Sequence, residues 1–162
     1  MKIKKSIITI VSFLFIFIFI YTAHSKIVDH YRFASTLSTS PLIGEQYARP
    51  IAWMIPASEI AIGFLLIIPS TRKIGLWLSL GLMIVFTAYL IFMVTSGLPK
   101  TCNCGGVISS MRWTQHIAFN FGLISLAACA LYIDKIYENI TKWNKIAIHK
   151  LTKKRNGPHW KY

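Results

Sequence analysis

Charged side chains are scarce in this sequence, and acidic ones are the scarcest. Of the 162 residues, 14% are charged and 54% are hydrophobic, whereas about a quarter of the residues of an ordinary soluble domain are charged. Five Asp and Glu stand against 18 Lys and Arg. This composition excludes an ordinary soluble domain and indicates a chain that lies mostly in a membrane.

Four runs of the chain lack charge almost completely. They cover residues 6–23, 51–70, 74–98 and 113–133. Each run is long enough for a helix to cross roughly 30 Å of hydrocarbon. The runs are continuously apolar rather than alternating, which argues against a β-barrel. We therefore predict an all-α fold, a polytopic membrane four-helix bundle in residues 1–135, followed by a basic cytoplasmic tail in residues 136–162.

The cations are distributed unevenly around these four runs. Thirteen lie before the first run, between the second and third, and after the fourth. The other five are Lys26, Arg32, Arg49, Lys100 and Arg112. The positive-inside rule then predicts that both termini are cytoplasmic and that the loop after the third run faces outward. Cytoplasmic loops that meet anionic lipid account for the positive charge, and without a nucleic-acid-binding motif we expect no nucleic acid partner.

Three segments allow further predictions. The first run resembles a signal peptide that ends at Ala23-His24-Ser25, but its long apolar core favours an uncleaved span. Residues 29–37 place Phe33 and Leu37 four apart, which predicts a short helix on the membrane surface. Residues 134–151 predict a surface amphipathic helix.

Two cysteines, Cys102 and Cys104, lie in the loop between the third and fourth runs, directly before Gly105 and Gly106. In an extended chain the Cα atoms of residues i and i+2 are about 7 Å apart, which is the limit for a disulfide. The glycines permit a turn that brings the cysteines closer. So small a ring is strained and easily reduced, which favours an exchanging redox centre over a structural disulfide.

Other interpretations of these cysteines remain open. The pair could be half of a metal site, with His116 or His30 as a third ligand. It could also be two thiols without chemistry. We expect Cys129, well inside the fourth run, to be a small buried packing residue.

Polar residues inside the runs form a second group of candidates. Glu59 is the only carboxylate within a run, and a buried carboxylate is costly unless it is paired or protonated. Glu59 lies about 13 Å below Pro50, and Asn120 about 10 Å below Trp113, so the two can meet. His116 shares the helix face of Asn120. These residues either join helices or form a polar track that carries protons or seats a quinone head group.

Several of these residues together resemble a known family. The matching motifs are Cys102-x-Cys104-Gly105-Gly106, Trp113-x-x-His116 with Asn120, Ser40-Pro41-Leu42-Ile43 and Ala52-Trp53-x-x-Pro56-x-x-Glu59. Over residues 5–133 the chain resembles the MauE branch of the DoxX-like membrane proteins. The resemblance implies a multi-pass protein of the bacterial inner membrane. It also implies a role in methylamine utilisation, where MauE and a thioredoxin-like partner are needed to produce the disulfide-rich small subunit of methylamine dehydrogenase.

The predicted architecture is also similar to that of DsbB and vitamin K epoxide reductase, which pass electrons from thiols to a quinone through two cysteine pairs. This chain has one pair, so an extracytoplasmic thioredoxin-like or disulfide-rich partner would deliver or accept the electrons. On this hypothesis Cys102 and Cys104 exchange electrons and His116 activates a thiol or shuttles its proton. Glu59, Asn120 and Trp113 are then candidate contacts for a quinone or a proton. The alternatives are a non-enzymatic membrane scaffold, or a metal-binding or small-solute membrane protein.

Overall fold

The computed structural model describes residues 2–96 and 113–155. In these ranges the secondary structure is helical: α1 (Lys2–Val28), α2 (His30–Ser38), α3 (Glu45–Ile67), α4 (Arg72–Thr95) and α5 (Trp113–Arg155). Within the described ranges, four helices, α1, α3, α4 and α5, are long and apolar enough to cross a membrane. The predicted all-α, multi-pass membrane fold is confirmed.

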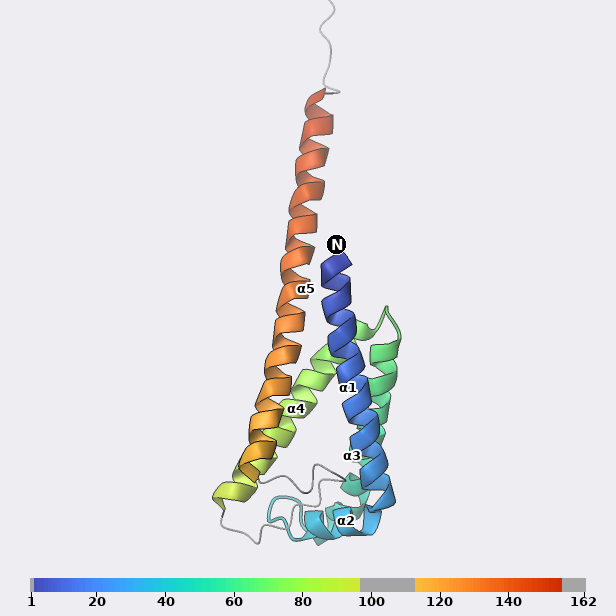
Figure 1. Cartoon of the computed structure of the whole chain (residues 1–162), viewed down its shortest axis with the longest axis vertical. Helices are drawn as coiled ribbons and strands as arrows, with labels where there is room; N and C mark the ends of the chain where they lie inside the picture. Colours follow the sequence, from blue (N-terminus) through green and yellow to red (C-terminus); the bar gives the residue numbers. More distant parts are fainter. Residues whose placement is uncertain (1, 97–112, 156–162) are drawn as a thin grey trace, which may run out of the picture.

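The four long helices pack side by side, and α2 lies across one end of the bundle (Figure 1). α1 packs chiefly on α3, and α4 packs on α5. The N-terminus, the turn between α3 and α4 and the projecting part of α5 lie toward one end of the molecule, whereas α2 lies at the other end (Figure 1). The start of α1 and the end of α5 therefore lie on the same side of the bundle, as four membrane crossings require.

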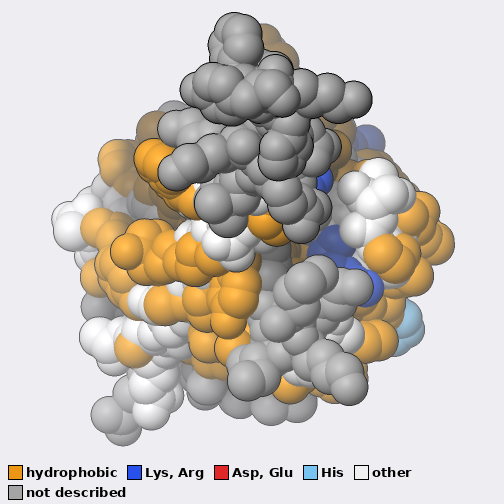
Figure 2. Space-filling view, turned by 90° about the horizontal axis from the view of Figure 1, so that it is seen from above, with side chains coloured by type: hydrophobic (Ala, Val, Ile, Leu, Met, Phe, Trp, Pro, Cys, Tyr) orange, Lys and Arg blue, Asp and Glu red, His pale blue; other side chains and the backbone are white. Residues whose placement is uncertain are grey.

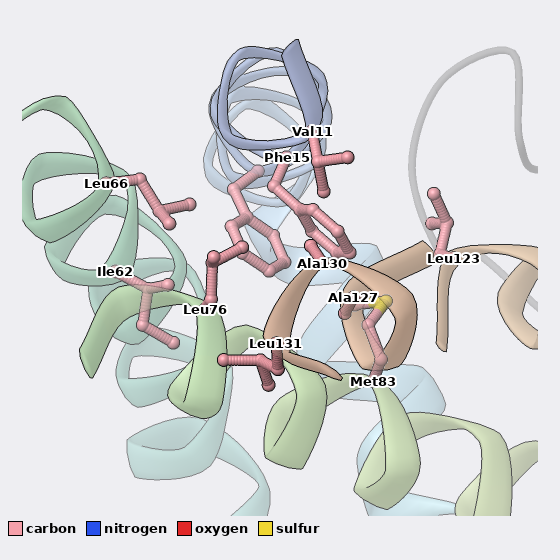
Figure 3. Close-up of a cluster of buried hydrophobic side chains, with 11 residues drawn as sticks. Val11, Phe15, Ile62, Leu66, Leu76, Met83, Leu123, Ala127, Ala130 and Leu131 are labelled. Atoms are coloured by element: carbon pink, nitrogen blue, oxygen red, sulfur yellow. The ribbon is translucent and has the colours of Figure 1, made fainter. Parts of the chain in front are cut away.

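One hydrophobic core joins the four long helices (Figure 3). Phe15 and Phe19 of α1 are fully buried, with 0% of their surface exposed. They meet residues of the other three helices, namely Ile62, Leu66, Leu76, Met83, Leu123, Ala127, Ala130 and Leu131. Each spanning helix therefore contributes its apolar stripe to the same interior.

Helices α3 and α4 approach closely near their shared turn. A Cβ on Gly75 would lie 2.9 Å from a side-chain carbon of Leu66 and 3.2 Å from the Leu66 backbone nitrogen. Small residues allow such close approach between membrane helices. Glycine at this position lets the first turn of α4 rest against the last turn of α3.

The outer surface of the bundle is apolar as well. Phe13, Phe17, Phe64 and Trp77 each expose more than half of their surface. Figure 2, which looks at one end of the molecule, shows hydrophobic side chains around the rim of the bundle and cations gathered in a small area. Such a surface suits hydrocarbon, and helices satisfy their backbone polar groups internally there. The chain is a multi-pass membrane protein.

The short surface helix predicted for residues 29–37 is present as α2. Its Phe33 and Leu37 are buried against Ala48 and Ala52 of α3. Gly44, the residue before α3, has a φ of 69°, a left-handed conformation that glycine adopts without strain. It turns the chain from α2 back into the membrane.

Two helices extend beyond the predicted runs at this end. α1 continues past Ala23 to Val28, and α3 begins at Glu45 with Pro50 and Pro56 inside it. The connection between the first two apolar runs, residues 24–50, is therefore mostly helical. As a result Lys26 belongs to a spanning helix, not to a loop.

Residues 134–151 are helical, as predicted, but they continue α5 and do not form a helix of their own. α5 is one continuous helix of 43 residues, about 64 Å long at the usual rise per residue. No Gly or Pro interrupts the chain between Gly122 and Gly157. Because nothing breaks the helix at Ile133, the basic segment continues its axis and projects beyond the bundle (Figure 1). The predicted boundary between residues 135 and 136 falls inside α5.

Candidate functional site

A buried ion pair links α1 to α3. Lys26 lies in the last turn of α1, and its Nζ donates a hydrogen bond to Oε1 of Glu59 near the middle of α3. The Lys26 side chain is 7% exposed and the Glu59 side chain 1%. Removing two charges from water costs several kcal/mol per ion, and the pairing offsets much of that cost. Each charge therefore depends on the other for its place in the bundle.

The spacing of α1 places Lys26 in the interior. Phe15, Phe19 and Lys26 follow at intervals of four and seven residues, so they share one helix face. That face is the one buried in the bundle. The buried face of α1 therefore finishes with Lys26, close to α2.

Aromatic rings surround the lysine. Its Nζ lies 5.0 Å from the ring centroid of Phe86 on α4 and 5.9 Å from that of Phe33 on α2. A cation within about 6 Å of a ring centroid is attracted by the ring's quadrupole. Elements α2, α3 and α4 therefore all stabilise the ammonium.

One oxygen of the glutamate is left over. Oε2 of Glu59 is buried and has no hydrogen-bond partner among the described residues. The hydroxyl of Thr22 lies close to Glu59 and donates to the carbonyl oxygen of Phe19, at 3.3 Å. A buried acceptor without a partner costs about 1–3 kcal/mol. The ion pair consequently presents an unused acceptor at the wall of a cavity.

That cavity has a volume of about 340 Å³ and all five helices contribute to its lining. Its polar residues include Lys26, Glu59, His116 and Asn120, and most of the remaining wall is Ile, Leu, Val, Phe and Met. Small-molecule sites are mostly apolar cavities of about 300–1,000 Å³ with a few placed polar groups. The size and the lining both fit this description.

The polar residues predicted from the sequence meet at this cavity. Glu59, His116 and Asn120 all line it. Asn120 is buried, and His116, one turn earlier on α5, is half-buried. Trp113 is the first residue of α5, but its side chain lies outside the described residues, as do Cys102 and Cys104.

Three other sequence interpretations have different outcomes. Cys129, expected to be buried, is exposed on α5, because it lies off the face formed by Ala127, Ala130 and Leu131. His30, a candidate metal ligand, stacks on Trp53 with 4.3 Å between ring centroids. In the described part of the chain no three His, Cys, Asp or Glu residues lie close enough to share a metal ion.

Sequence reasoning missed the role of Lys26, which it counted among the five cations of the outer side. The signal was present in the chain: the heptad-like stripe of α1 continues to Lys26, and the first residue that favours a helix end is Asp29. A lone carboxylate inside a membrane span also implies a cation within reach. Both clues require α1 to extend five residues further than its apolar run.

A second set of ionic contacts lies at the other end of the bundle. Lys73 contacts Asp134 at 3.2 Å and Glu138 at 2.7 Å, which joins the start of α4 to α5. Arg72 donates to the hydroxyl of Thr9 at 2.9 Å and to the carbonyl oxygen of Leu66 at 3.2 Å. These contacts fasten the turn between α3 and α4 to α1 and α5.

Comparison with known proteins adds one finding. The sequence model of a family described as "Methylamine utilisation protein MauE" matches residues 4–133. No curated protein and no solved structure gives a significant match. The matched range contains α1 from residue 4 onward, α2 to α4, and the part of α5 that lines the cavity.

Proposed function

The chain belongs to the MauE family of methylamine utilisation proteins, and on that premise we propose that it exchanges thiol and disulfide electrons with a partner outside the cytoplasm. The partner is a thioredoxin-like or disulfide-rich protein, as in the maturation of methylamine dehydrogenase. The membrane concerned is the bacterial inner membrane. The Cys102 and Cys104 pair is the redox centre.

The position of this pair in the chain is the observation that carries the proposal. Cys102 and Cys104 lie in the connection between α4, which ends at Thr95, and α5, which begins at Trp113. The positive-inside rule assigns this connection to the outer face, where disulfides persist. In a chain made mostly of apolar helices, it is the place where a thiol pair meets a soluble protein.

The exchange proceeds through a mixed disulfide. A thiolate of one protein attacks a disulfide sulfur of the other, and the second cysteine then resolves the linkage. His116 lies about 4.5 Å along the helix axis from the first residue of α5, so it is our candidate for taking and returning the thiol proton. Glu59 and Asn120, with Trp113, are the candidates for a proton or quinone contact deeper in the bundle.

Trapping tests the proposal. With the Cys104→Ser variant in intact cells, we expect a reducible adduct between Cys102 and a cysteine-containing extracytoplasmic protein, because the resolving thiol is absent. Non-reducing electrophoresis and mass spectrometry of the linked peptides would identify both sulfurs. The Cys129→Ser variant should trap nothing, and a Cys102→Ser/Cys104→Ser variant should abolish the adduct. If neither an internal nor a mixed disulfide ever forms, the redox role is wrong.

A membrane scaffold is the second candidate, and the projecting part of α5 favours it. This segment continues well past the membrane-sized part of the helix and carries Lys135, Lys142 and Lys145 in exposed positions. A scaffold would use such a helix to hold a maturation partner near the bilayer. Full maturation activity in the Cys102→Ser/Cys104→Ser variant would support the scaffold over the redox protein.

A further inference from the structure

We infer that the cavity beside Lys26 and Glu59 binds the head group of a lipid-soluble quinone and its quinol. This inference rests on the proposed thiol–disulfide function, because that function requires an acceptor or donor of electrons. The argument for the site itself comes from the hydrogen-bonding groups of the cavity and from its lining.

The ion pair offers both kinds of hydrogen-bonding group to a ligand. An ammonium carries three donors, and within the described ranges the Lys26 Nζ has one hydrogen-bond acceptor, Glu59 Oε1. Oε2 of Glu59 is an acceptor without a described partner. A ligand that combines acceptor and donor oxygens would satisfy both residues at once.

A quinone and its quinol fit this arrangement in both redox states. The carbonyl oxygens of the quinone accept hydrogen bonds, which Lys26 can donate. The hydroxyl groups of the quinol can also donate, which matches the unused oxygen of Glu59. An alkyl carboxylate would instead place a second negative charge against buried Glu59, which is unfavourable in a cavity of low polarity.

The lining of the cavity indicates that such a ligand arrives from the membrane. The wall is built by the spanning helices and is mostly apolar. Phe33 and Leu37 of α2 also contribute to it, so α2 closes the cavity toward the end of the bundle. A volume of about 340 Å³ suits a ring with a few substituents, while an isoprenoid tail would remain among the lipids.

The electron balance closes with this ligand. Oxidation of the Cys102 and Cys104 dithiol breaks two S–H bonds, forms one S–S bond and releases two electrons and two protons. The quinone takes up the two electrons and the two protons and forms two O–H bonds as it becomes the quinol. Reduction of the disulfide by a quinol is the reverse of this step.

Equilibrium binding to the purified full-length protein in detergent tests the site. The probes are decylubiquinone and menadione, titrated by calorimetry against a micelle blank, with oleate as a rival ligand. We expect saturable binding of at least one quinone. The Lys26→Met/Glu59→Leu variant, which removes both charges together, should bind about tenfold or more weakly, because the ligand loses its hydrogen bonds to both charged groups.

Matched variants separate this site from a general loss of structure. Lys135→Met removes an exposed cation outside the cavity and should leave the dissociation constant unchanged. Helical content and elution volume, measured on every variant, show which of them are folded. Because the paired substitution leaves no lone buried charge, we expect it to fold.

The outcomes are distinguishable from those of the thiol experiment. The Cys102→Ser/Cys104→Ser variant should bind quinone normally, since the site contains neither cysteine. Absence of quinone binding, equal binding by the folded Lys26→Met/Glu59→Leu variant, or displacement by oleate at equal concentration would each overturn the quinone site. None of these results depends on whether a mixed disulfide is trapped.

Discussion

At the residue scale, two charges determine the character of the bundle interior. Lys26 and Glu59 come from different helices and neutralise one another away from water. A buried pair is weak evidence for stability, since an apolar pair of similar volume is often as stable or more so. Its retention in a membrane interior is better explained by a ligand or a proton that uses it.

Separate and combined substitutions measure how strongly the pair is coupled. Lys26→Met alone leaves Glu59 buried without its cation, and we expect it to lower the free energy of unfolding by about 3 kcal/mol or more. Glu59→Leu alone should have a similar cost. The Lys26→Met/Glu59→Leu variant should be more stable than either, because no lone charge remains.

Denaturant unfolding in micelles, followed by helical content, checks this cycle. Lys135→Met provides the control, since its exposed cation should change stability by less than about 0.5 kcal/mol. Costs that simply add in the double variant would show that the two side chains do not interact.

At the scale of the elements, α5 combines two roles. Its first half lines the cavity and packs in the core, whereas the second half leaves the bundle as an uninterrupted helix. Lys73 contacts Asp134 and Glu138 at the point where α5 leaves the other helices. These contacts hold the projecting half in line with the first.

A distance measurement tests the continuity of α5. Spin labels at Leu126→Cys and Ile146→Cys, both at exposed positions and in a chain with its native cysteines replaced, should lie about 30 Å apart along the axis. Pulsed electron paramagnetic resonance in lipid nanodiscs gives this distance. A separate surface helix that bends at Ile133 would shorten it and broaden the distribution, in contradiction to the structure.

At the scale of the whole molecule, the direction of insertion decides which proteins can reach the cysteines. Burial of Lys26 removes one of the five cations first assigned to the outer side. A cation buried inside the bundle does not face the outer aqueous phase, so the predicted asymmetry becomes larger. The rule then favours cytoplasmic termini more strongly than the original distribution did.

Labelling of intact cells tests this direction. After mild reduction, a membrane-impermeant maleimide should label the chain in whole cells, because Cys102 and Cys104 are predicted to face outward. The Cys102→Ser/Cys104→Ser variant should stay unlabelled, since Cys129 lies within the candidate span that ends at Ile146. Labelling that appears only after the membrane is opened would reverse the proposed orientation.

Much of the fold was accessible from the sequence because it depends on local composition. Four almost uncharged runs predicted the four long helices, and the spacing of Phe33 and Leu37 predicted α2. The helix limits were less accurate, because a helix continues through polar residues until a breaking residue or a tertiary contact ends it. Both α1, which continues to Val28, and α5, which continues to Arg155, extend past their apolar runs in this way.

The candidate site was predicted in part for the same reason. An isolated carboxylate in a hydrocarbon span is conspicuous, so Glu59 and the polar face of His116 and Asn120 could be found from the chain alone. Lys26 could not be paired with Glu59 in this way, because 33 residues separate them and the contact exists only once α1 lies against α3.

By itself, the sequence determined that this protein crosses a membrane several times and belongs to the MauE family, since hydrophobic length and motif spacing are properties of the linear chain. Only the tertiary structure decided that Lys26 pairs with Glu59 inside the bundle and that a cavity forms beside the pair. The physical reason is that a charge enters an apolar interior only where packing brings its counter-charge within bonding distance.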